Sequence, residues 1–318
     1  METVPFGKLD FKVSRISFGG GAVSGEGGGY GFGAIDEKAA AGLLRAAYDA
    51  GINLFDTAPI YGYGMSERRI GKAFAGMRDR VFIVSKCGVD WDQDKTPRID
   101  NDPAVVRRML EQSLRDLATD YIDLYLIHWP DKKVDVRRTM EVLAQARKDG
   151  KIRAIGLSNF YDPAEIRKAA EIERVDVVQT EFNIFHTQAR DELLPFLKSE
   201  EMGYMSWGTF DKGILTGRVT RERKFEHNDF RQVDWGRWQA GEAKLRAMDR
   251  IAPLLRDRGL DGRRLAFGFV FAHPEASTAI CGVKSPEQLA TALEALENRA
   301  PRGVVDEAVR IAAEEAAK

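Results

Sequence analysis

The sequence is poor in cysteine, has no long apolar run and favours neither sign of charge. Its 318 residues include only two cysteines. Two thiols cannot form a disulfide framework, and we expect both, Cys87 and Cys281, to be buried structural residues. No apolar run approaches the roughly 18 residues of a membrane span, and the N-terminal METVPFGKLDFKV lacks the apolar core of a signal peptide. We therefore expect a cytoplasmic protein that does not enter a membrane.

Charge and histidine content argue against two further classes of function. The 48 basic and 49 acidic residues give a formal charge of −1, so there is no reason to expect nucleic acid or an anionic membrane as a partner. The four histidines show no short ligand spacing, and we expect no metal site. The remaining composition, 44% hydrophobic and 31% charged, is that of a globular protein with a large core.

Short apolar runs alternate with helical patterns through most of the chain. Such runs are typical of parallel strands that are covered on both faces. They lie at residues 15–19, 52–57, 81–86, 122–129, 154–159, 177–182, 203–208 and 278–283. Eight strand–helix units in a chain of this length predict a single α/β domain over residues 1–318, a (β/α)8 TIM barrel.

Four segments lie outside these units. Gly7-Lys8 separates two alternating stretches, which predicts an N-terminal β-hairpin. Residues 88–101 and 209–242 are surplus loops, which we expect at the C-terminal face of the barrel. Residues 304–318 have the pattern of an amphipathic helix that packs on the barrel.

Several helix boundaries can also be predicted. Asp102, Asp162 and Ser285 each precede a proline, which indicates an N-cap followed by proline at the first helical position. Ser66 is expected to cap the helix after the second strand. Three glycines follow helical runs and are expected to end those helices: Gly51, Gly150 and Gly203.

The glycine-rich stretch before the first long helix offers a different architecture. Residues 29–34, GYGFGA, fit the dinucleotide fingerprint G-x-G-x-x-A, and Asp56 ends a strand-like run about 20 residues later. In a Rossmann fold, however, the strand runs directly into the first glycine, whereas here the nearest strand ends near Gly19. We therefore favour a first loop at the mouth of a barrel.

Polar residues stand at successive strand ends, where a barrel would bring them to one mouth. Asp56 closes the second strand, Lys86 the third and His128 the fourth, and Tyr61 follows Asp56 in the next loop. An ammonium group beside a phenol favours phenolate, so Lys86 is expected to lower the pKa of Tyr61 from its usual value near 10. A phenol tuned in this way, next to an imidazole, can protonate a carbonyl oxygen as hydride reaches the carbon.

At these residues the sequence resembles the aldo-keto reductase superfamily, over essentially the whole chain. The motifs that carry the resemblance are GINLFDTAPIYGYGMSERRIGKAF, VSKCG, DLYLIHWP, IRAIGLSNF and VQTEFNIF. The resemblance implies a (β/α)8 barrel whose catalytic tetrad is Asp56, Tyr61, Lys86 and His128. It also implies NADPH, or less often NADH, bound across the barrel mouth without a Rossmann domain.

The resemblance also assigns cofactor contacts. Ser158, Asn159 and Gln179 match the residues that hold the nicotinamide amide, and Trp207 stands where an aromatic residue stacks under the nicotinamide ring. After it, GTFDKGILTG replaces the common SPLARGLLTG. The predicted contacts of that loop, which would lie over the pyrophosphate, are Gly208, Thr209, Gly213, Leu215 and Gly217.

The segment AICGVKSPEQLATAL corresponds to the family's region for the adenosine end of the cofactor. A capped helix N-terminus is a ready anion site, and Lys284 and Ser285 suit a 2′-phosphate, which favours NADPH over NADH. Cys281, Thr291 and Ala292 depart from the family pattern and suggest a weaker grip on adenine. The predicted contacts here are Gly282, Val283, Lys284, Ser285 and Gln288.

Tryptophans in the surplus loops and at a strand end suggest a substrate class. Trp91, Trp129 and Trp235, with Trp238 nearby, are accompanied by polar residues that can bind hydroxyl groups. We therefore expect reduction of a sugar-type aldehyde or ketone. The segment MSWGTFDKGILTGRVTRERKF also resembles bacterial sugar-handling members, including reductases that convert 6-oxo-glucose to glucose.

Two alternatives to this reductase remain. The same tetrad serves an NAD(P)+-dependent dehydrogenase that oxidises a sugar or alcohol. More remotely, some relatives act as cofactor-binding regulatory subunits of channels. The oligomeric state cannot be inferred from the sequence.

Overall fold

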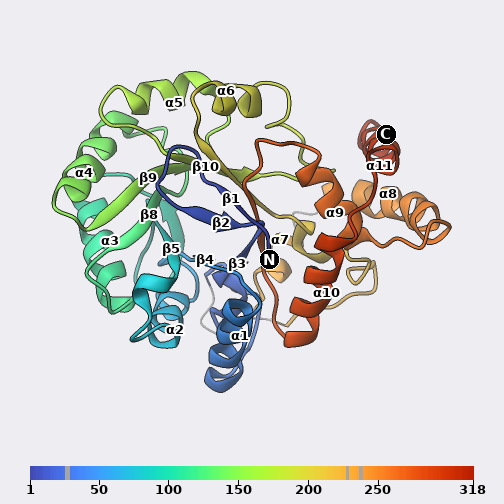
Figure 1. The fold of residues 1–318 in the computed structure, drawn as a ribbon, viewed down its shortest axis with the longest axis horizontal. Helices are drawn as coiled ribbons and strands as arrows, with labels where there is room; N and C mark the ends of the chain where they lie inside the picture. Colours follow the sequence, from blue (N-terminus) through green and yellow to red (C-terminus); the bar gives the residue numbers. More distant parts are fainter. Residues whose placement is uncertain (26–28, 227–228, 236–238) are drawn as a thin grey trace.

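The fold is known from a computed structural model that describes residues 1–25, 29–226, 229–235 and 239–318. A closed barrel of eight parallel strands forms its centre, as the sequence predicts (Figure 1). In order around the barrel the strands are β10 (Val177–Glu181), β11 (Gly203–Trp207), β12 (Thr278–Cys281), β3 (Ile16–Gly19), β4 (Leu54–Asp56), β5 (Phe82–Cys87), β8 (Ile122–Ile127) and β9 (Ile152–Ser158). Each of the predicted strand runs corresponds to one of these strands.

Helices cover the outside of the barrel. They are α1 (Glu37–Asp49), α2 (Met65–Ala73), α3 (Pro103–Asp116), α4 (Val136–Lys148), α5 (Pro163–Ala170), α6 (Leu193–Ser199), α9 (Gly262–Phe271) and α10 (Pro286–Glu297). Short 3-10 helices lie at Gly20–Val23, Arg78–Arg80 and Asp211–Gly213. Among the described residues, no helix is long and apolar enough to span a membrane.

The predicted N-caps at the prolines are confirmed, whereas two other boundaries are wrong. The side chains of Asp102, Asp162 and Ser285 accept hydrogen bonds from backbone N–H groups in the first turns of α3, α5 and α10. Ser66 lies inside α2, which begins after a left-handed glycine, and its hydroxyl is used elsewhere. Gly203 begins β11, and the left-handed residue after α6 is Glu201, with φ of 55°.

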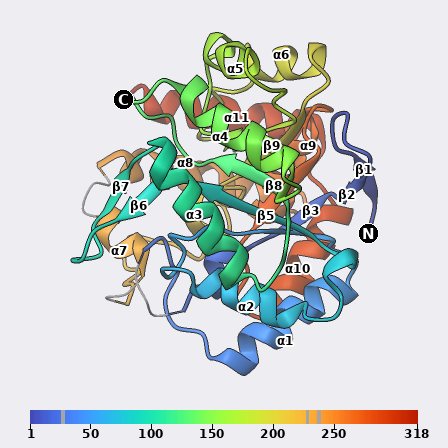
Figure 2. The same ribbon diagram turned by 90° about the vertical axis from the view of Figure 1, so that its left-hand side faces the viewer.

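The segments outside the barrel lie at its two ends and along one side. The N-terminal hairpin of β1 (Thr3–Pro5) and β2 (Lys12–Ser14) is confirmed. The loop after β5 forms a second hairpin, β6 (Val89–Trp91) with β7 (Pro97–Ile99), at the other end of the barrel (Figure 2). The second surplus region contains α7 (Phe230–Trp235) and leads into α8 (Gln239–Arg256), which packs on the C-terminal helix α11 (Arg302–Ala316).

The alternation of side chains along the strands separates two cores. Val84 of β5 belongs to a cluster inside the barrel, whereas its neighbour Ile83 belongs to the larger cluster between strands and helices. Phe6 of the N-terminal hairpin is fully buried in the inner cluster. The hairpin therefore closes one end of the barrel, and the polar residues gather at the other.

Candidate active site

The structure brings the four predicted tetrad residues together at the carboxyl ends of β4, β5 and β8. The Lys86 ammonium donates hydrogen bonds of 2.8 Å to both carboxylate oxygens of Asp56 and to the carbonyl oxygen of Thr57. It lies 5.1 Å from the centroid of the Tyr61 ring. The Tyr61 and His128 rings meet edge to face, with centroids 6.0 Å apart.

Strand geometry explains why these side chains point inward. Side chains two residues apart along a strand share a face. Leu54 and Val84 belong to the inner cluster, so Asp56 and Lys86, two residues farther along, also face the interior. Parallel strands end at the same edge, and their last inward residues therefore meet at the mouth.

Burial controls the protonation of this group. It raises the pKa of Tyr61 well above its usual value, and the Asp56 carboxylate raises that pKa further. The expectation of an acidified phenol is therefore wrong for this state, because burial, and after it the nearby Asp56 carboxylate, disfavours the phenolate. Burial and the charge of Lys86 together hold the pKa of His128 well below its usual value. The mouth thus presents a protonated phenol beside a neutral imidazole.

Amide side chains on the neighbouring strands are tied to the tetrad. Gln179 donates a hydrogen bond of 2.8 Å to Asp56, and the Ser158 hydroxyl lies 3.4 Å from the Gln179 carbonyl oxygen. The side-chain amide of Asn159 donates to the backbone oxygen of His128 at 2.9 Å. Trp207 donates its indole N–H to the Asn159 carbonyl oxygen at 3.0 Å, which fixes the orientation of the half-buried ring.

Comparisons with known proteins agree with this geometry. A sequence model described as "Aldo/keto reductase family" matches residues 15–312. The chain belongs to the aldo/keto reductase family. It is 36% identical over 294 residues to the aldo-keto reductase YhdN of Bacillus subtilis (strain 168), a match that covers 91% of this chain and 87% of that protein. It is 29% identical to the NADH-specific methylglyoxal reductase of Escherichia coli (strain K12), over 93% of this chain and 94% of that one.

Solved structures show the same architecture. The glycerol dehydrogenase AKR11B4 from Gluconobacter oxydans superposes with a TM-score of 0.82 at 29% identity, covering 98% of this chain and 95% of the other. The holo form of the aldo-keto reductase AKR11C1 from Bacillus halodurans gives 0.78 at 22% identity, over 98% and 96%, and supports the fold alone. Membership of the family supports NAD(P)H-dependent carbonyl reduction of a small molecule by this protein.

In this aldo/keto reductase the loop after β11 is strongly curved. Gly208, Gly213 and Gly217 have φ of 68°, 103° and 70°, a region that favours glycine. Thr209 donates its hydroxyl hydrogen bond, 2.9 Å long, to the carbonyl oxygen of Ile280 in β12. Leu215 is fully buried. Thr209 and Leu215 therefore hold the loop on the barrel.

The segment after β12 is tied to the glycine-rich first loop. Lys284 donates a hydrogen bond of 2.8 Å from its ammonium group to the carbonyl oxygen of Phe32. Its backbone N–H donates to the Gln288 side chain, and Ser285 accepts from the Gln288 N–H as the cap of α10. Gly282 is exposed and Val283 is buried beside them. These contacts place a cation beside a capped helix N-terminus.

The tryptophans predicted to bind substrate do not all lie beside the tetrad. Trp129 lies 6.5 Å from both His128 and Trp207, measured between ring centroids, and so borders the tetrad. Trp91 ends β6 and packs edge to face on Tyr63 at 5.2 Å. The side chain of Trp235, at the end of α7, and the whole of Trp238 lie outside the described part of the chain.

Tyr30 is a site residue that the sequence reasoning missed. An isolated bridge pairs Gly29 with Tyr61 and carries the Tyr30 ring over the mouth, 6.3 Å from His128 and 5.0 Å from Phe230. Tyr30 also raises the pKa of Tyr61. The available signal was an aromatic residue in the middle of a glycine-rich loop at the barrel mouth.

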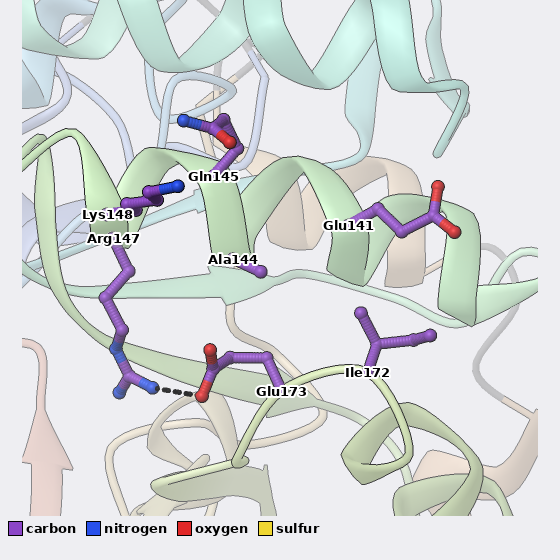
Figure 3. Close-up of a pocket in the computed structure, with 7 residues that line it drawn as sticks. All are labelled: Glu141, Ala144, Gln145, Arg147, Lys148, Ile172 and Glu173. Atoms are coloured by element: carbon purple, nitrogen blue, oxygen red, sulfur yellow. Dashed lines mark hydrogen bonds and ion pairs between the residues drawn. The ribbon is translucent and has the colours of Figure 1, made fainter.

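Other polar clusters and hollows lie away from the tetrad. Glu181, His186 and Asp211 are close enough to share a cation, but the Lys244 ammonium lies 2.9 Å from both the His186 ring and the Asp211 carboxylate. A hollow of about 490 Å3 lies on the outside of the helix layer, between α4 and the segment after α5 (Figure 3). Another, of about 480 Å3, lies between α9 and α11.

Proposed function

We propose that this aldo/keto reductase reduces a polyhydroxylated, sugar-type aldehyde or ketone with NADPH, and that Tyr61 protonates the carbonyl oxygen. The proposal rests on one observation, the contacts among four side chains at the mouth of the barrel: Asp56, Lys86, Tyr61 and His128. The raised pKa of Tyr61 keeps the phenol in the form that can donate a proton. A neutral His128 can donate a hydrogen bond to the same oxygen.

The residues around the mouth fit a nicotinamide dinucleotide. Trp207 offers a half-buried aromatic face, and Asn159 and Gln179 bring amide groups beside it. The curved backbone at Gly217 leaves room for a pyrophosphate, since an added Cβ there would meet none of the described residues within 4 Å. When bound, the cofactor supplies the hydride.

The preference for NADPH rests on the charge at the adenosine end. Lys284 stands beside the N-terminus of α10, where a phosphate gains from both the ammonium and the positive end of the helix dipole. Burial lowers the pKa of Lys284, and the charge of Arg231, which lies in the same region, lowers it further. One relative is described as NADH-specific, so the cofactor must be tested directly in this protein.

The sugar preference rests on aromatic residues around the tetrad. Trp129, Tyr30 and Tyr63 belong to one cluster of partly buried side chains beside Tyr61. Aromatic faces stack on the C–H faces of sugars, and phenolic and indole groups bind hydroxyls. A structural relative described as a glycerol dehydrogenase also acts on a polyol. We keep 6-oxo-glucose as a specific candidate, and oxidation of a sugar or alcohol as the second candidate function.

The test is NADPH consumption with D-glyceraldehyde, 6-oxo-glucose and 4-nitrobenzaldehyde. We expect turnover of the hydroxylated aldehydes, and we expect Tyr61→Phe to lower kcat by about 100-fold or more while the dinucleotide still binds. Turnover restricted to the apolar nitrobenzaldehyde would refute the sugar preference. Equal affinities for NADH and NADPH in a fluorescence titration would refute the phosphate preference, and wild-type turnover by Tyr61→Phe would refute the role of Tyr61.

A further inference from the structure

Glu67 is a buried carboxyl group that the proposed reaction does not use. It lies in the first turn of α2 and is fully buried. A carboxylate is costly to bury unless a cation or several hydrogen bonds compensate its charge. Here Ser85 donates one hydrogen bond of 2.6 Å to Oε1, and Oε2 has no hydrogen-bond partner in the described part of the chain.

Hydroxyl groups lie close to Glu67, and among the described residues no cation forms an ion pair with it. The Ser113 hydroxyl of α3 acts on both Glu67 and Tyr125 of β8, and all three side chains are fully buried. The Asp116 carboxylate, also of α3, acts on Glu67 with a like charge. Burial without an ion pair among the described residues favours the protonated form of the Glu67 carboxyl group.

Glu67 lies behind the strand that carries Lys86. Ser85, its hydrogen-bond donor, precedes Lys86 in β5, and adjacent residues of a strand point to opposite faces. Lys86 therefore faces the mouth while Ser85 faces α2. The two charges still act on each other, since Lys86 lowers the pKa of Glu67 and Glu67 raises the pKa of Lys86.

The first turn of α2 also contacts the backbone next to the tetrad. Ser66 donates a hydrogen bond of 2.9 Å to the carbonyl oxygen of Gly20 and accepts one of 2.8 Å from the Thr57 hydroxyl. The Thr57 carbonyl oxygen is in turn one of the acceptors of the Lys86 ammonium. The first turn of α2 thus joins the ends of β3, β4 and β5.

We propose that Glu67 is a positioning residue whose carboxyl group acts on Lys86 from the far side of β5. The charge of this carboxyl group depends on pH. Burial raises the pKa of Glu67 to about 7. Above that pH its carboxyl group releases a proton to solvent, and a second negative charge joins Asp56 near Lys86 and Tyr61. Proton donation leaves negative charge on Tyr61, so the ionised form of Glu67 disfavours this step.

The groups that face Glu67 from each neighbouring element do not remove this effect. Burial has the largest effect on the pKa of Glu67 and raises it, as does Asp116. The hydrogen bonds of Ser85 and Ser113 and the charge of Lys86 lower it. Tyr125 and Cys87 both have pKa values raised by burial and stay neutral in this range. Glu67 is therefore the group expected to titrate behind β5.

This inference rests on the proposed reductase activity and is tested first by the pH dependence of kcat/KM with NADPH and D-glyceraldehyde. We expect wild-type kcat/KM to fall as pH rises through about 7 and Glu67→Gln to lose this fall, because glutamine keeps the Ser85 hydrogen bond without a charge. Glu37→Gln is the matched control. Glu37 of α1 pairs with Arg69 of α2, the helix that carries Glu67, but the Glu37 side chain is more than half exposed. A Glu67→Gln profile that superposes on that of the wild type would overturn the proposal.

A second variant and a measurement that needs no turnover keep the test independent of the reaction. Ser85→Ala removes a hydrogen bond that lowers the pKa of Glu67, so the fall in kcat/KM should move to higher pH. The folded-state pKa lies above the unfolded one, so the native state binds more protons between the two values. Ionisation therefore destabilises the wild type as pH rises from about 4.3 to 7. The Tm of Glu67→Gln relative to that of the wild type should therefore rise over this pH window. A Tm difference that does not change with pH would contradict the titration of Glu67, even if no carbonyl is turned over.

Discussion

At the scale of single residues, the tetrad depends on one buried ion pair. Lys86 and Asp56 are almost completely buried, and each compensates the charge of the other. Removing one partner leaves an uncompensated charge, whereas removing both does not. We expect Asp56→Asn to lower the free energy of unfolding by about 3–5 kcal/mol, and Asp56→Asn with Lys86→Met to recover most of this loss without recovering activity. Urea unfolding of the two variants measures both values.

An exposed ion pair supplies the control for this prediction. Lys8 and Glu201 lie 2.7 Å apart, but their side chains are 48% and 66% exposed. Solvent-exposed pairs contribute about 0–1 kcal/mol, so Lys8→Met should change the unfolding free energy little. Similar losses for Lys8→Met and Asp56→Asn would show that burial does not control the stability of the tetrad pair.

The sequence predicts which residues form the tetrad better than it predicts their protonation. Asp56, Lys86 and His128 follow apolar runs, and the meeting of parallel strand ends brings them together. The pKa of Tyr61 depends on how completely the surrounding chain excludes water, which no local pattern states. Tyr30 was missed for a related reason: the bridge from Gly29 to Tyr61 joins two irregular loops.

At the scale of elements, α8 holds the loop that is proposed to cover the cofactor. Asp211 in that loop is fully buried, and the Lys244 ammonium of α8 contacts both its oxygens at 2.9 and 3.1 Å. We expect Lys244→Met to increase the Kd for NADPH about tenfold, a loss of about 1.4 kcal/mol. Fluorescence titration measures the affinity.

Hydrogen exchange separates this effect from a general loss of stability. Faster exchange in residues 208–217, with unchanged exchange in β5, would show that Lys244 acts on the loop. Lys198→Met is the control, because Lys198 pairs with Glu275 at 3.4 Å but is 69% exposed. If Lys244→Met binds NADPH with the affinity of the wild type, the loop does not depend on α8.

Element boundaries were predictable where side chains cap helices and not where turns are made by contacts distant in sequence. Asp102 and Asp162 carry their own hydrogen-bonding groups, so the pattern before each proline suffices. Ser66 looks like a cap, but its hydroxyl binds the carbonyl oxygen of Gly20, 46 residues away. The β6–β7 hairpin, whose second strand is exposed, has no apolar alternation that would predict it.

At the scale of the whole molecule, the two ends of the barrel have separate tasks. Catalytic side chains of such barrels lie at the carboxyl ends of the strands, and the opposite end serves stability. In this protein the fully buried Phe6 fills the opposite end and packs against Phe11, with ring centroids 5.9 Å apart. The added Cβ of an alanine at Gly203 would approach the Phe6 ring to 2.6 Å, which shows how closely the ring is enclosed.

This separation predicts that stability and turnover can be changed independently. Phe6→Ala removes a buried ring and leaves a cavity, and we expect it to lower the free energy of unfolding by about 3–5 kcal/mol. Ile99→Ala, at the mouth, should cost little, because Ile99 is 47% exposed. The hairpin lies at the opposite end of the barrel from the tetrad (Figure 2), so kcat/KM of folded Phe6→Ala should stay within about twofold of the wild type. A loss of kcat/KM that parallels the loss of stability would show instead that packing at the closed end reaches the strand ends where Asp56 and Lys86 meet.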